Sequence, residues 1–210
     1  MLANLLSGVM PMKCPGWVFA VLPFVLFSCA DANEGNPRWA AFPVTLYSDQ
    51  AVVATAESER DFRDAMGFWE EKAGRRLFDY KGVWAGSGKP YSGSASNPGT
   101  IFANIIFKPS PWPLNGNVAG QTSFLYTDSR IHGAIVLLNR ELATCSGDCP
   151  VSYGRTSERR VITHELGHFL GLTHNEKDAT NIMYPTVMPG GTLSTMKVDA
   201  ASLAALTKAD

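Results

Sequence analysis

Residues 163–174 of the chain read THELGHFLGLTH, and three of the four histidines of the whole sequence lie in this stretch. In a helix with 100° per residue, His164 and His168 stand about 40° apart around the axis and about 6 Å apart along it, so both imidazoles can converge on one ion. The opposite face of the same helix carries the apolar side chains Ile162, Leu166, Phe169 and Leu170. The stretch therefore predicts a helix with one face in the core and the other at a metal.

His174 determines which kind of metal site is predicted. In a continuous helix it would point about 120° away from His168, so the chain must turn sharply before it can supply a third ligand. Gly171 provides that turn, because glycine readily adopts the left-handed conformation that ends a helix. Three neutral imidazoles leave a fourth position on zinc for water, as in a catalytic site, and Glu165 is placed to take a proton from that water.

A bare H-E-x-x-H pattern is weak evidence, since it also occurs by chance and in structural helices. Here the whole stretch from His164 to His174 resembles the H-E-x-x-H-x-x-G-x-x-H signature of the metzincin metallopeptidases. Met183, within Asn181-Ile-Met-Tyr-Pro185, resembles the methionine of the Met-turn, whose implied role is an apolar floor under the histidines. Within this clan, the Met-Tyr-Pro sequence and the small domain are most similar to bacterial-type matrixins, the matrix-metalloproteinase-like family.

The sequence departs from the matrixin pattern close to the third histidine. Asn175 follows His174 where matrixins usually carry serine, and the segment from His174 to Met183 is slightly longer than is usual in that family. No tyrosine occupies the second position after Met183, so the additional tyrosine ligand of astacins and serralysins is not implied. The exact subfamily stays open at this point.

The resemblance implies an α+β fold with a metzincin-like catalytic domain. Such a domain has a twisted five-stranded mixed sheet, a helix in its N-terminal half, an active-site helix, a Met-turn and a C-terminal helix. The resemblance also implies one catalytic Zn²⁺ and an extended polypeptide substrate, which would add to the sheet edge formed by Val118 to Tyr126. Pro185 to Val187 would form the pocket wall beside the metal.

The periodicity of the chain agrees with this order of elements. Alternation and β-branched or aromatic content predict strands at 43–48, 77–80, 100–107, 118–126 and 131–139. Apolar residues at helical spacing predict helices at 57–73, from about 156 to 170 and at 198–208. The Gly-, Ser- and Pro-rich stretches 82–99 and 108–116 are predicted to be loops.

The composition is that of one compact domain with a short appendage. The chain has 210 residues, a hydrophobic content of 45% and a formal net charge of −1. It contains no long basic run, so the charge pattern does not favour nucleic acid as a partner. No feature of the sequence indicates an oligomeric state.

The appendage is predicted at the N-terminus. The apolar run from Trp17 to Phe27 follows Lys13 and precedes small and polar residues, which is the layout of an export signal. The run is too short to span a bilayer as a helix, and Pro23 interrupts it. The alternative is a buried strand or helix at the domain edge. We predict a signal segment at 1–29, a linker at 30–37 and a zinc metallopeptidase catalytic domain at 38–210.

The end of the apolar run, Leu26-Phe27-Ser28-Cys29, resembles the bacterial lipobox, in which the cysteine is lipidated and becomes the mature N-terminus. Lipidation of Cys29 and ordinary cleavage between Ala30 and Ala32 are both open. The protein is therefore predicted to be exported, either secreted or held in the cell envelope as a lipoprotein. If Cys29 is lipidated, Ala30 in the next position favours the outer membrane.

Two further cysteines, Cys145 and Cys149, bracket Ser-Gly-Asp in a loop-like segment. In an exported chain, a pair at this spacing is typical of a small disulfide. The alternatives are a zinc knuckle, which would need two more ligands nearby, and two free thiols.

These observations predict an exported zinc-dependent endopeptidase that hydrolyses peptide bonds with zinc-activated water and Glu165 as the general base. The alternative is a non-catalytic exported protein that uses zinc for stability and binds peptides or surfaces. Glu165 favours the enzyme, because a structural site has no use for a carboxylate beside the metal. His132 is interpreted as a satisfied surface or core residue. Asp148, Asp178 and Glu176 could bind Ca²⁺, but they lack the spacing of a hard-cation site.

Overall fold

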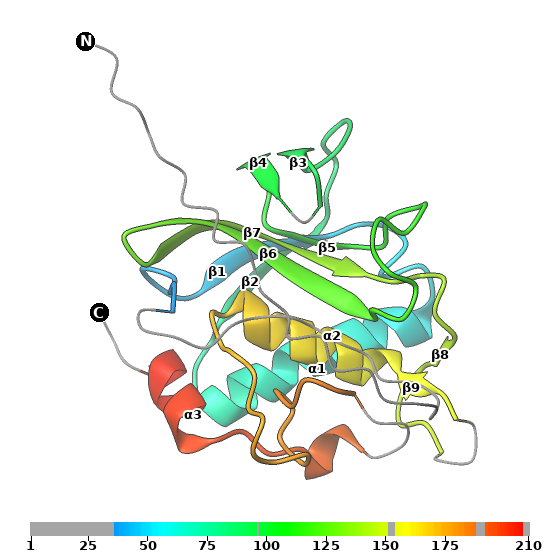
Figure 1. The fold of residues 1–210 in the computed structure, drawn as a ribbon, viewed down its shortest axis with the longest axis vertical. Helices are drawn as coiled ribbons and strands as arrows, with labels where there is room; N and C mark the ends of the chain where they lie inside the picture. Colours follow the sequence, from blue (N-terminus) through cyan, green and yellow to red (C-terminus); the bar gives the residue numbers. More distant parts are fainter. Residues whose placement is uncertain (1–35, 96, 151–153, 188–191, 208–210) are drawn as a thin grey trace, which may run out of the picture.

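The structure is a computed structural model that describes residues 36–95, 97–150, 154–187 and 192–207. The predicted signal segment 1–29, with Cys29, and most of the predicted linker 30–37 lie outside the described residues. Figure 1 shows a sheet with two long helices on one face and a small two-stranded hairpin on the other. Among the described helices, none has both the length and the hydropathy needed to cross a membrane.

Five strands form the main sheet. They span Val44–Ser48 (β1), Phe78–Val83 (β2), Ile105–Phe107 (β5), Gly120–Thr127 (β6) and Arg130–Leu138 (β7). Their order is β2-β1-β5-β7-β6, and all neighbours pair in parallel except β6, which runs antiparallel to β7 at one edge. The predicted five-stranded mixed sheet of an α+β fold is therefore confirmed.

The helices begin and end at local sequence signals. They span Ala56–Ala73 (α1), Glu158–Phe169 (α2) and Ala200–Thr207 (α3), with a 3₁₀ helix at Leu193–Thr195 (η2). The Thr55 hydroxyl caps the start of α1, and Gly74, with a φ of 64°, ends it. The Ser157 hydroxyl caps the start of α2, so the helix begins where the sequence predicts.

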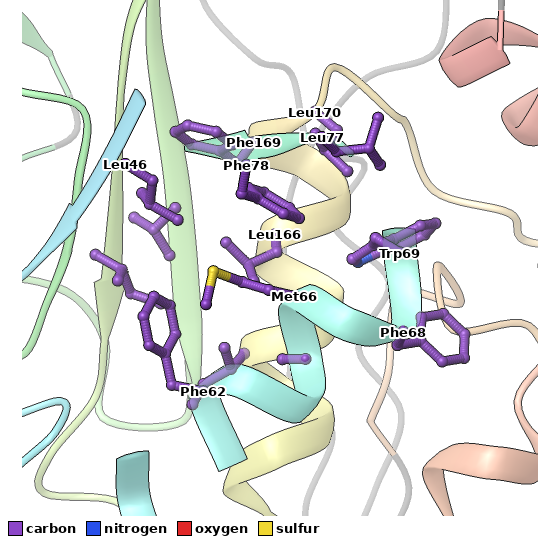
Figure 2. Close-up of a cluster of buried hydrophobic side chains, with 14 of the residues drawn as sticks. Leu46, Phe62, Met66, Phe68, Trp69, Leu77, Phe78, Leu166, Phe169 and Leu170 are labelled. Atoms are coloured by element: carbon purple, nitrogen blue, oxygen red, sulfur yellow. The ribbon is translucent and has the colours of Figure 1, made fainter. Parts of the chain in front are cut away.

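The main core lies between the sheet and the two long helices (Figure 2). α1 presents Met66 and Trp69 to this core, and α2 presents Leu166 and Phe169. Trp69 is fully buried, and its Nε1 donates a hydrogen bond of 2.7 Å to Thr163 O on α2. Burial of a large apolar side chain stabilises a fold by about 1.5–3 kcal/mol. These contacts hold α2, which carries two of the histidines, in a fixed position on the sheet.

The other face of the sheet carries a hairpin that the sequence did not predict. Strands β3 (Tyr91–Gly93) and β4 (Pro98–Ile101) pair antiparallel, mostly within the stretch 82–99 that was predicted as a loop. Tyr91 is buried, with its ring centroid 5.8 Å from that of Phe107. The loop prediction is wrong here, because strand formation depends on packing against the neighbouring sheet more than on local composition.

The single strand predicted at 100–107 is also wrong, because β4 ends at Ile101 and β5 begins only at Ile105. Asn104 lies in the gap. Its side-chain amide donates to Thr45 O at 3.1 Å, and its side-chain carbonyl accepts from Ala134 N at 3.1 Å. One side chain thus bridges β1 and β7 at the point where the strand is interrupted.

Cys145 and Cys149 form a disulfide, as the sequence predicts. The disulfide closes the loop that begins at β8 (Thr144–Cys145), a short strand that pairs in parallel with β9 (Thr156–Ser157). Because β9 leads directly into α2, this loop is fastened to the N-terminal end of the helix that carries the histidines.

Candidate metal centre

Three histidines converge beside α2. His164 and His168 lie on the helix, and His174 returns from the loop that follows it. Nε2 of His174 is 3.2 Å from Nε2 of His164 and 3.0 Å from Nε2 of His168. Each ring offers one ligand atom, and these atoms all lie within 4.8 Å of one another. Because zinc binds histidine nitrogen at about 2.0–2.1 Å, three nitrogens at this spacing fit one zinc ion.

Backbone carbonyls hold the second nitrogen of two of these rings. Nδ1 of His164 is 2.8 Å from Ile182 O, and Nδ1 of His168 is 2.8 Å from Leu172 O. Because a carbonyl oxygen only accepts, each Nδ1 carries the proton and each Nε2 presents a lone pair. Hydrogen bonds of this kind orient ligating imidazoles and fix their tautomer.

Burial keeps the three rings neutral at pH 7. Removal from water, together with the nearby His174, lowers the pKa of His164 to about 4. Burial also lowers the pKa of His174 to about 4 and the pKa of His168 well below its ordinary value. Neutral imidazoles keep their lone pairs available, so near neutral pH protonation does not compete with metal binding at these nitrogens.

Gly171 turns the chain back toward the histidines with a φ of 91°, in the left-handed region. Its N–H donates to His168 O at 2.7 Å, and the N–H of Leu172 donates to Gly167 O at 3.0 Å. This pair of bonds is the Schellman motif that ends a helix. A Cβ on Gly171 would lie 2.6 Å from Pro37 O, so steric contact as well as φ requires glycine here.

The segment before β1 crosses the C-terminal end of α2. Trp39 Nε1 donates to Phe169 O at 2.6 Å, and the two ring centroids are 5.4 Å apart. The backbone of Arg38 donates to Ser129 O and accepts from Ile131 N, both at 2.8 Å. These contacts fasten the end of α2, where the chain turns toward the third histidine, to the β6–β7 hairpin.

Met183 is fully buried against α2. Gly167 makes room for it, because a Cβ on Gly167 would lie 2.3 Å from Met183 Sδ and 2.6 Å from Trp69 Cζ2. The side-chain oxygen of Asn181 accepts from Met183 N at 2.8 Å and so shapes the turn. The methionine thioether therefore packs against the helix at the residue before His168.

The carboxylate of Asp199 links the last helix to both loops of the site. Its Oδ2 accepts from Asn175 Nδ2 at 3.2 Å and from Asn181 Nδ2 at 3.3 Å. Its Oδ1 accepts from Ser202 N at 2.9 Å in the first turn of α3. Because Asn175 directly follows His174, one carboxylate joins the loop of the third histidine to the methionine loop.

Glu165 is 2% exposed and lies beside the histidines on α2. Burial raises the pKa of its carboxyl to about 8, and a hydrogen bond from Thr122 opposes this rise. Thr122 Oγ1 is 2.9 Å from Glu165 Oε2 and 3.1 Å from Glu165 O. A Cβ on Gly120 would lie 2.7 Å from Glu165 Cγ, so β6 approaches this side chain through a glycine.

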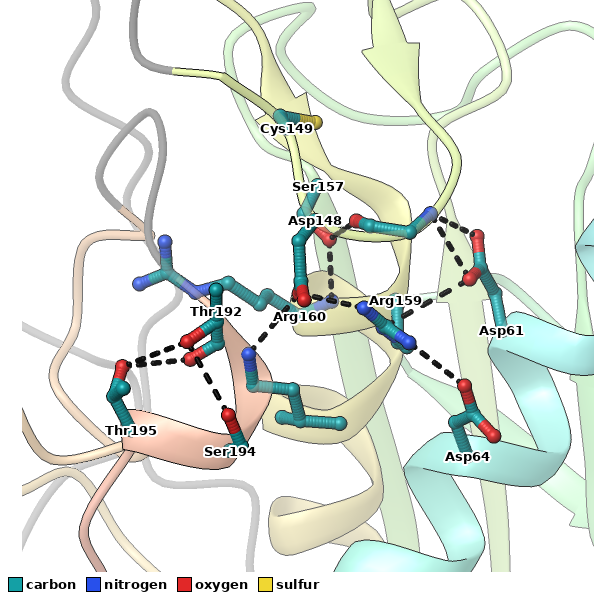
Figure 3. A network of polar contacts seen from close by, with 12 residues as sticks. Asp61, Asp64, Asp148, Cys149, Ser157, Arg159, Arg160, Thr192, Ser194 and Thr195 are labelled. Atoms are coloured by element: carbon teal, nitrogen blue, oxygen red, sulfur yellow. Dashed lines mark hydrogen bonds and ion pairs between the residues drawn. The ribbon is translucent and has the colours of Figure 1, made fainter.

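The N-terminal end of α2 carries a network of ion pairs, shown in Figure 3. Arg159 Nη1 is 2.7 Å from Asp64 Oδ2, its Nη2 is 2.5 Å from Asp148 Oδ1, and its Nε is 3.9 Å from Asp61 Oδ1. Gly147 N, within the disulfide loop, donates to both carboxylate oxygens of Asp61 at 3.0 and 2.9 Å. The network joins α1, α2 and the disulfide loop.

The other candidate residues lie outside the histidine cluster. His132 Nε2 is 2.6 Å from Thr127 Oγ1 on the β6–β7 hairpin. Asp148 belongs to the network of Figure 3, Asp178 accepts hydrogen bonds within its own loop, and Glu176 is exposed. Within the described ranges, the three histidines form the only group of at least three His, Cys, Asp or Glu side chains spaced for one metal.

Sequence reasoning missed four residues that shape this site. Thr122 and Asp199 are brought to it only by tertiary packing, so no local pattern marks them. Gly120 and Gly167 carry a weak signal. A glycine inside a helix destabilises it by about 1 kcal/mol relative to alanine, so Gly167, in the last turn of α2, indicates that something packs closely against it.

A model of the matrixin family, a peptidase family, matches residues 39–207, which is most of the chain. The chain belongs to the matrixin family. The resemblance carried by the stretch from His164 to His174 is therefore confirmed. Matrixins are zinc metallopeptidases, and zinc is the metal that the three nitrogens fit. No curated protein matches this matrixin significantly.

Two solved structures are similar to this matrixin at low sequence identity. Metalloproteinase-II from Bacteroides fragilis is 15% identical with a TM-score of 0.47, and the match covers 87% of this chain and 55% of that one. A zinc-dependent peptidase from Methanocorpusculum labreanum (strain Z) is 13% identical with a TM-score of 0.36, covering 77% of this chain and 98% of that one. The chain thus spans 55% of the length of the Bacteroides protein.

Proposed function

We propose that this matrixin is an exported zinc-dependent endopeptidase that hydrolyses internal peptide bonds of proteins, with Glu165 as the general base. One observation carries the proposal: the buried carboxylate of Glu165 lies on the same helix turn as two of three converging imidazoles. Structural zinc sites use four protein ligands, whereas three ligands and a nearby carboxylate are typical of a hydrolytic site.

His164, His168 and His174 are the residues that would hold the metal. Their neutral rings each offer one nitrogen, and the Nδ1–H groups of His164 and His168 are fixed by backbone carbonyls. When bound there, Zn²⁺ supplies a Lewis acid and lowers the pKa of the water at its fourth position. Met183 gives the site an apolar floor against α2.

Glu165 would carry the proton during hydrolysis. It accepts a proton from the attacking water and returns it to the nitrogen of the departing amine. Burial raises the pKa of Glu165 to about 8 in the metal-free site. A cation held by the three imidazoles would favour the ionised carboxylate, which is the form that accepts a proton. Thr122 donates a hydrogen bond to this carboxylate.

The proposed substrate is an extended polypeptide that adds to the outer edge of β6. β6 ends the strand order, with β7 on its inner side, so its outer edge is the one that a further strand would join. Backbone hydrogen bonds to β6 would give affinity, and the proposed pocket wall from Pro185 to Val187 would select a side chain. Val187 is buried and packs against the main core.

Export is the second part of the proposal. The apolar run within residues 1–29 supports an export signal, and the disulfide between Cys145 and Cys149 supports an oxidising compartment. We propose either cleavage after this segment or lipidation of Cys29, with anchoring in the outer membrane. Labelling of cells with a fatty-acid probe, with Cys29→Ala as the control, distinguishes the two, since only a lipidated protein loses its label on substitution.

The activity is tested with purified protein on casein and on an internally quenched peptide with blocked ends, which only an endopeptidase cleaves. A chelator should abolish cleavage, and added zinc should restore it. Glu165→Gln should lower kcat/KM by about 100- to 10,000-fold while one zinc stays bound, because general acid–base catalysis contributes this factor. Glu176→Gln, the same change at an exposed position, should leave cleavage at the wild-type rate.

Cleavage that survives Glu165→Gln would contradict the role of this residue. Zinc bound at one ion per chain without cleavage of either substrate would favour the alternative, a zinc-stabilised exported protein that binds peptides or surfaces.

A further inference from the structure

The carboxylate of Glu165 has an unusual set of neighbours for a buried acid. Among the described residues it has no cationic partner, and Thr122 is the side chain that donates a hydrogen bond to it. Burial of an ionised carboxylate is unfavourable unless donors compensate for the lost water. The position of this carboxylate therefore depends on the Thr122 hydroxyl.

The strand β6 encloses the carboxylate through two residues on one of its faces. Gly120 and Thr122 are two positions apart, so they face the same side of the strand, toward α2. A Cβ on Gly120 would lie 2.8 Å from Glu165 Oε1, while Thr122 Oγ1 is 2.9 Å from Oε2. The backbone of Gly120 thus limits the space around Oε1, and the Thr122 hydroxyl holds Oε2.

The Thr122 hydroxyl has two acceptors on the same residue. Its single proton can be donated to Glu165 Oε2 at 2.9 Å or to Glu165 O at 3.1 Å. When the carboxylate has accepted a proton from water, the hydroxyl can turn to the backbone oxygen without movement of heavy atoms. The same contact therefore serves Glu165 before and after proton transfer.

We infer that Thr122 is a positioning residue for the general base: it holds the Glu165 carboxylate against β6, the strand along which the substrate is proposed to bind. The inference rests on the proposed function and adds a residue to it. Because Thr122 lies on β6, its hydrogen bond fixes the position of the Glu165 carboxylate relative to the strand that would bind the peptide.

The test compares Thr122→Val, which keeps the shape of the side chain, with Thr122→Ser, which keeps the hydroxyl. We expect Thr122→Val to lower kcat on the quenched peptide by about 10- to 100-fold, the factor that a hydrogen bond to a charged group supplies, with KM changed less than about twofold. Thr122→Ser should restore kcat to within about threefold, and zinc affinity, measured with a chromophoric chelator, should be the same in both variants.

Thr144→Val is the matched control. Thr144 Oγ1 donates to Glu158 Oε2 at 3.2 Å at the other end of α2. The Thr144→Val variant therefore loses the same kind of hydrogen bond, but far from the histidines. We expect wild-type kcat in this variant. Gly120→Ala is a second test should Thr122→Val fold poorly, because the added methyl group would displace the carboxylate from its other side and lower kcat with zinc still bound.

A readout independent of hydrolysis is the ¹³Cδ NMR resonance of Glu165 in protein labelled with ¹³C-glutamate, assigned with Glu165→Gln. Thr122→Val should shift or broaden this resonance, whereas Thr144→Val should change only that of Glu158. An unchanged Glu165 resonance in Thr122→Val, or a kcat loss that serine does not restore, overturns the inference. Absence of hydrolysis by the wild-type protein would instead count against the proposed function, and the resonance would still decide the role of Thr122.

Discussion

The two halves of α2 differ in how their polar side chains are compensated. In the first half, Lys108 lies 2.5 Å from Glu158, and three aspartates surround Arg159 (Figure 3). In the second half, His164 and His168 donate to backbone carbonyls, and Glu165 accepts from a neutral hydroxyl. One helix thus combines a charge-paired end and an end whose partners are mostly uncharged.

This difference indicates that the first half of α2 mainly stabilises the fold, whereas the second half carries the groups suited to metal binding and proton transfer. Removal of one partner from a buried ion pair is destabilising, because it leaves the other charge buried and uncompensated. An acid or base without a counterion has a perturbed pKa and a free lone pair, which are the properties that proton transfer and metal binding require. Substitutions in the first half should therefore change the free energy of unfolding with little effect on the site, whereas substitutions in the second half should also change metal binding and hydrolysis.

The largest expected effect on stability comes from the charge-paired half. Arg159→Met removes the cation that faces three carboxylates, one of which, Asp61, has a side chain only 4% exposed. Loss of one partner from a buried ion pair typically costs about 3–5 kcal/mol. Because the side chains of Asp64 and Asp148 are 41% and 38% exposed, we expect a loss at the lower end, about 3 kcal/mol, in the free energy of unfolding measured with urea. The kcat of the folded zinc-loaded fraction should stay within about threefold of wild type, because no atom of the site is removed.

The control for this prediction is an exposed ion pair. Arg63 lies 2.7 Å from Glu59 on the surface of α1, and Arg63→Met should cost only about 0.3–0.5 kcal/mol. If Arg159→Met is as mild as Arg63→Met, the first half of α2 does not have the stabilising role described above.

The next prediction tests whether metal binding by the second half of α2 depends on close packing around Gly167. Gly167→Ala would place a Cβ 2.3 Å from Met183 Sδ and 2.6 Å from Trp69 Cζ2. Overpacking of this kind costs about 1–3 kcal/mol, and it should weaken zinc binding because it moves α2 away from the methionine loop. Zinc affinity by chelator competition and urea unfolding measure the two effects. Wild-type values for both would mean that this contact is not tight in solution.

The last prediction concerns the stability of the metal-free protein as a function of pH. Burial raises the pKa of Glu165 from 4.5 to about 8 in the folded chain. Between these values the folded chain binds more protons than the unfolded one, so Glu165 lowers stability as pH rises through this window. Glu165→Gln removes this contribution and should raise the melting temperature at pH 8 by at least about 3 °C, with no difference near pH 4. Equal melting temperatures at pH 8 would contradict the raised pKa.

The histidine site could be predicted from sequence because its determinants are local. The spacing of His164 and His168 follows from the geometry of one helix, and Gly171 marks where the chain must turn for His174 to return. The structure brings the Nε2 atoms of these three residues together as the spacing indicates. The start of α2 was predictable for the same reason, since Ser157 is a local cap.

The features that escaped prediction depend on contacts between distant segments. Tyr91 forms a strand because it is buried next to Phe107, and Asn104 interrupts a hydrophobic run because it bridges β1 and β7. Thr122 belongs to a strand that sequence patterns identify, but only the docking of α2 on β6 brings it to Glu165. The periodicity of a strand indicates which face a residue occupies, not which side chain it meets there.

The carboxylate of Asp199 has a consequence for the order in which the site is completed during synthesis. All three imidazoles and Met183 leave the ribosome before Asp199, the residue that joins Asn175 to Asn181. A nascent chain that ends just after the methionine loop therefore possesses all three imidazoles and the backbone hydrogen bond of 2.9 Å from Asn175 N to Met183 O, but it lacks the side-chain link through Asp199. The carboxylate link between the two loops can therefore form only after the first turn of α3 has been made.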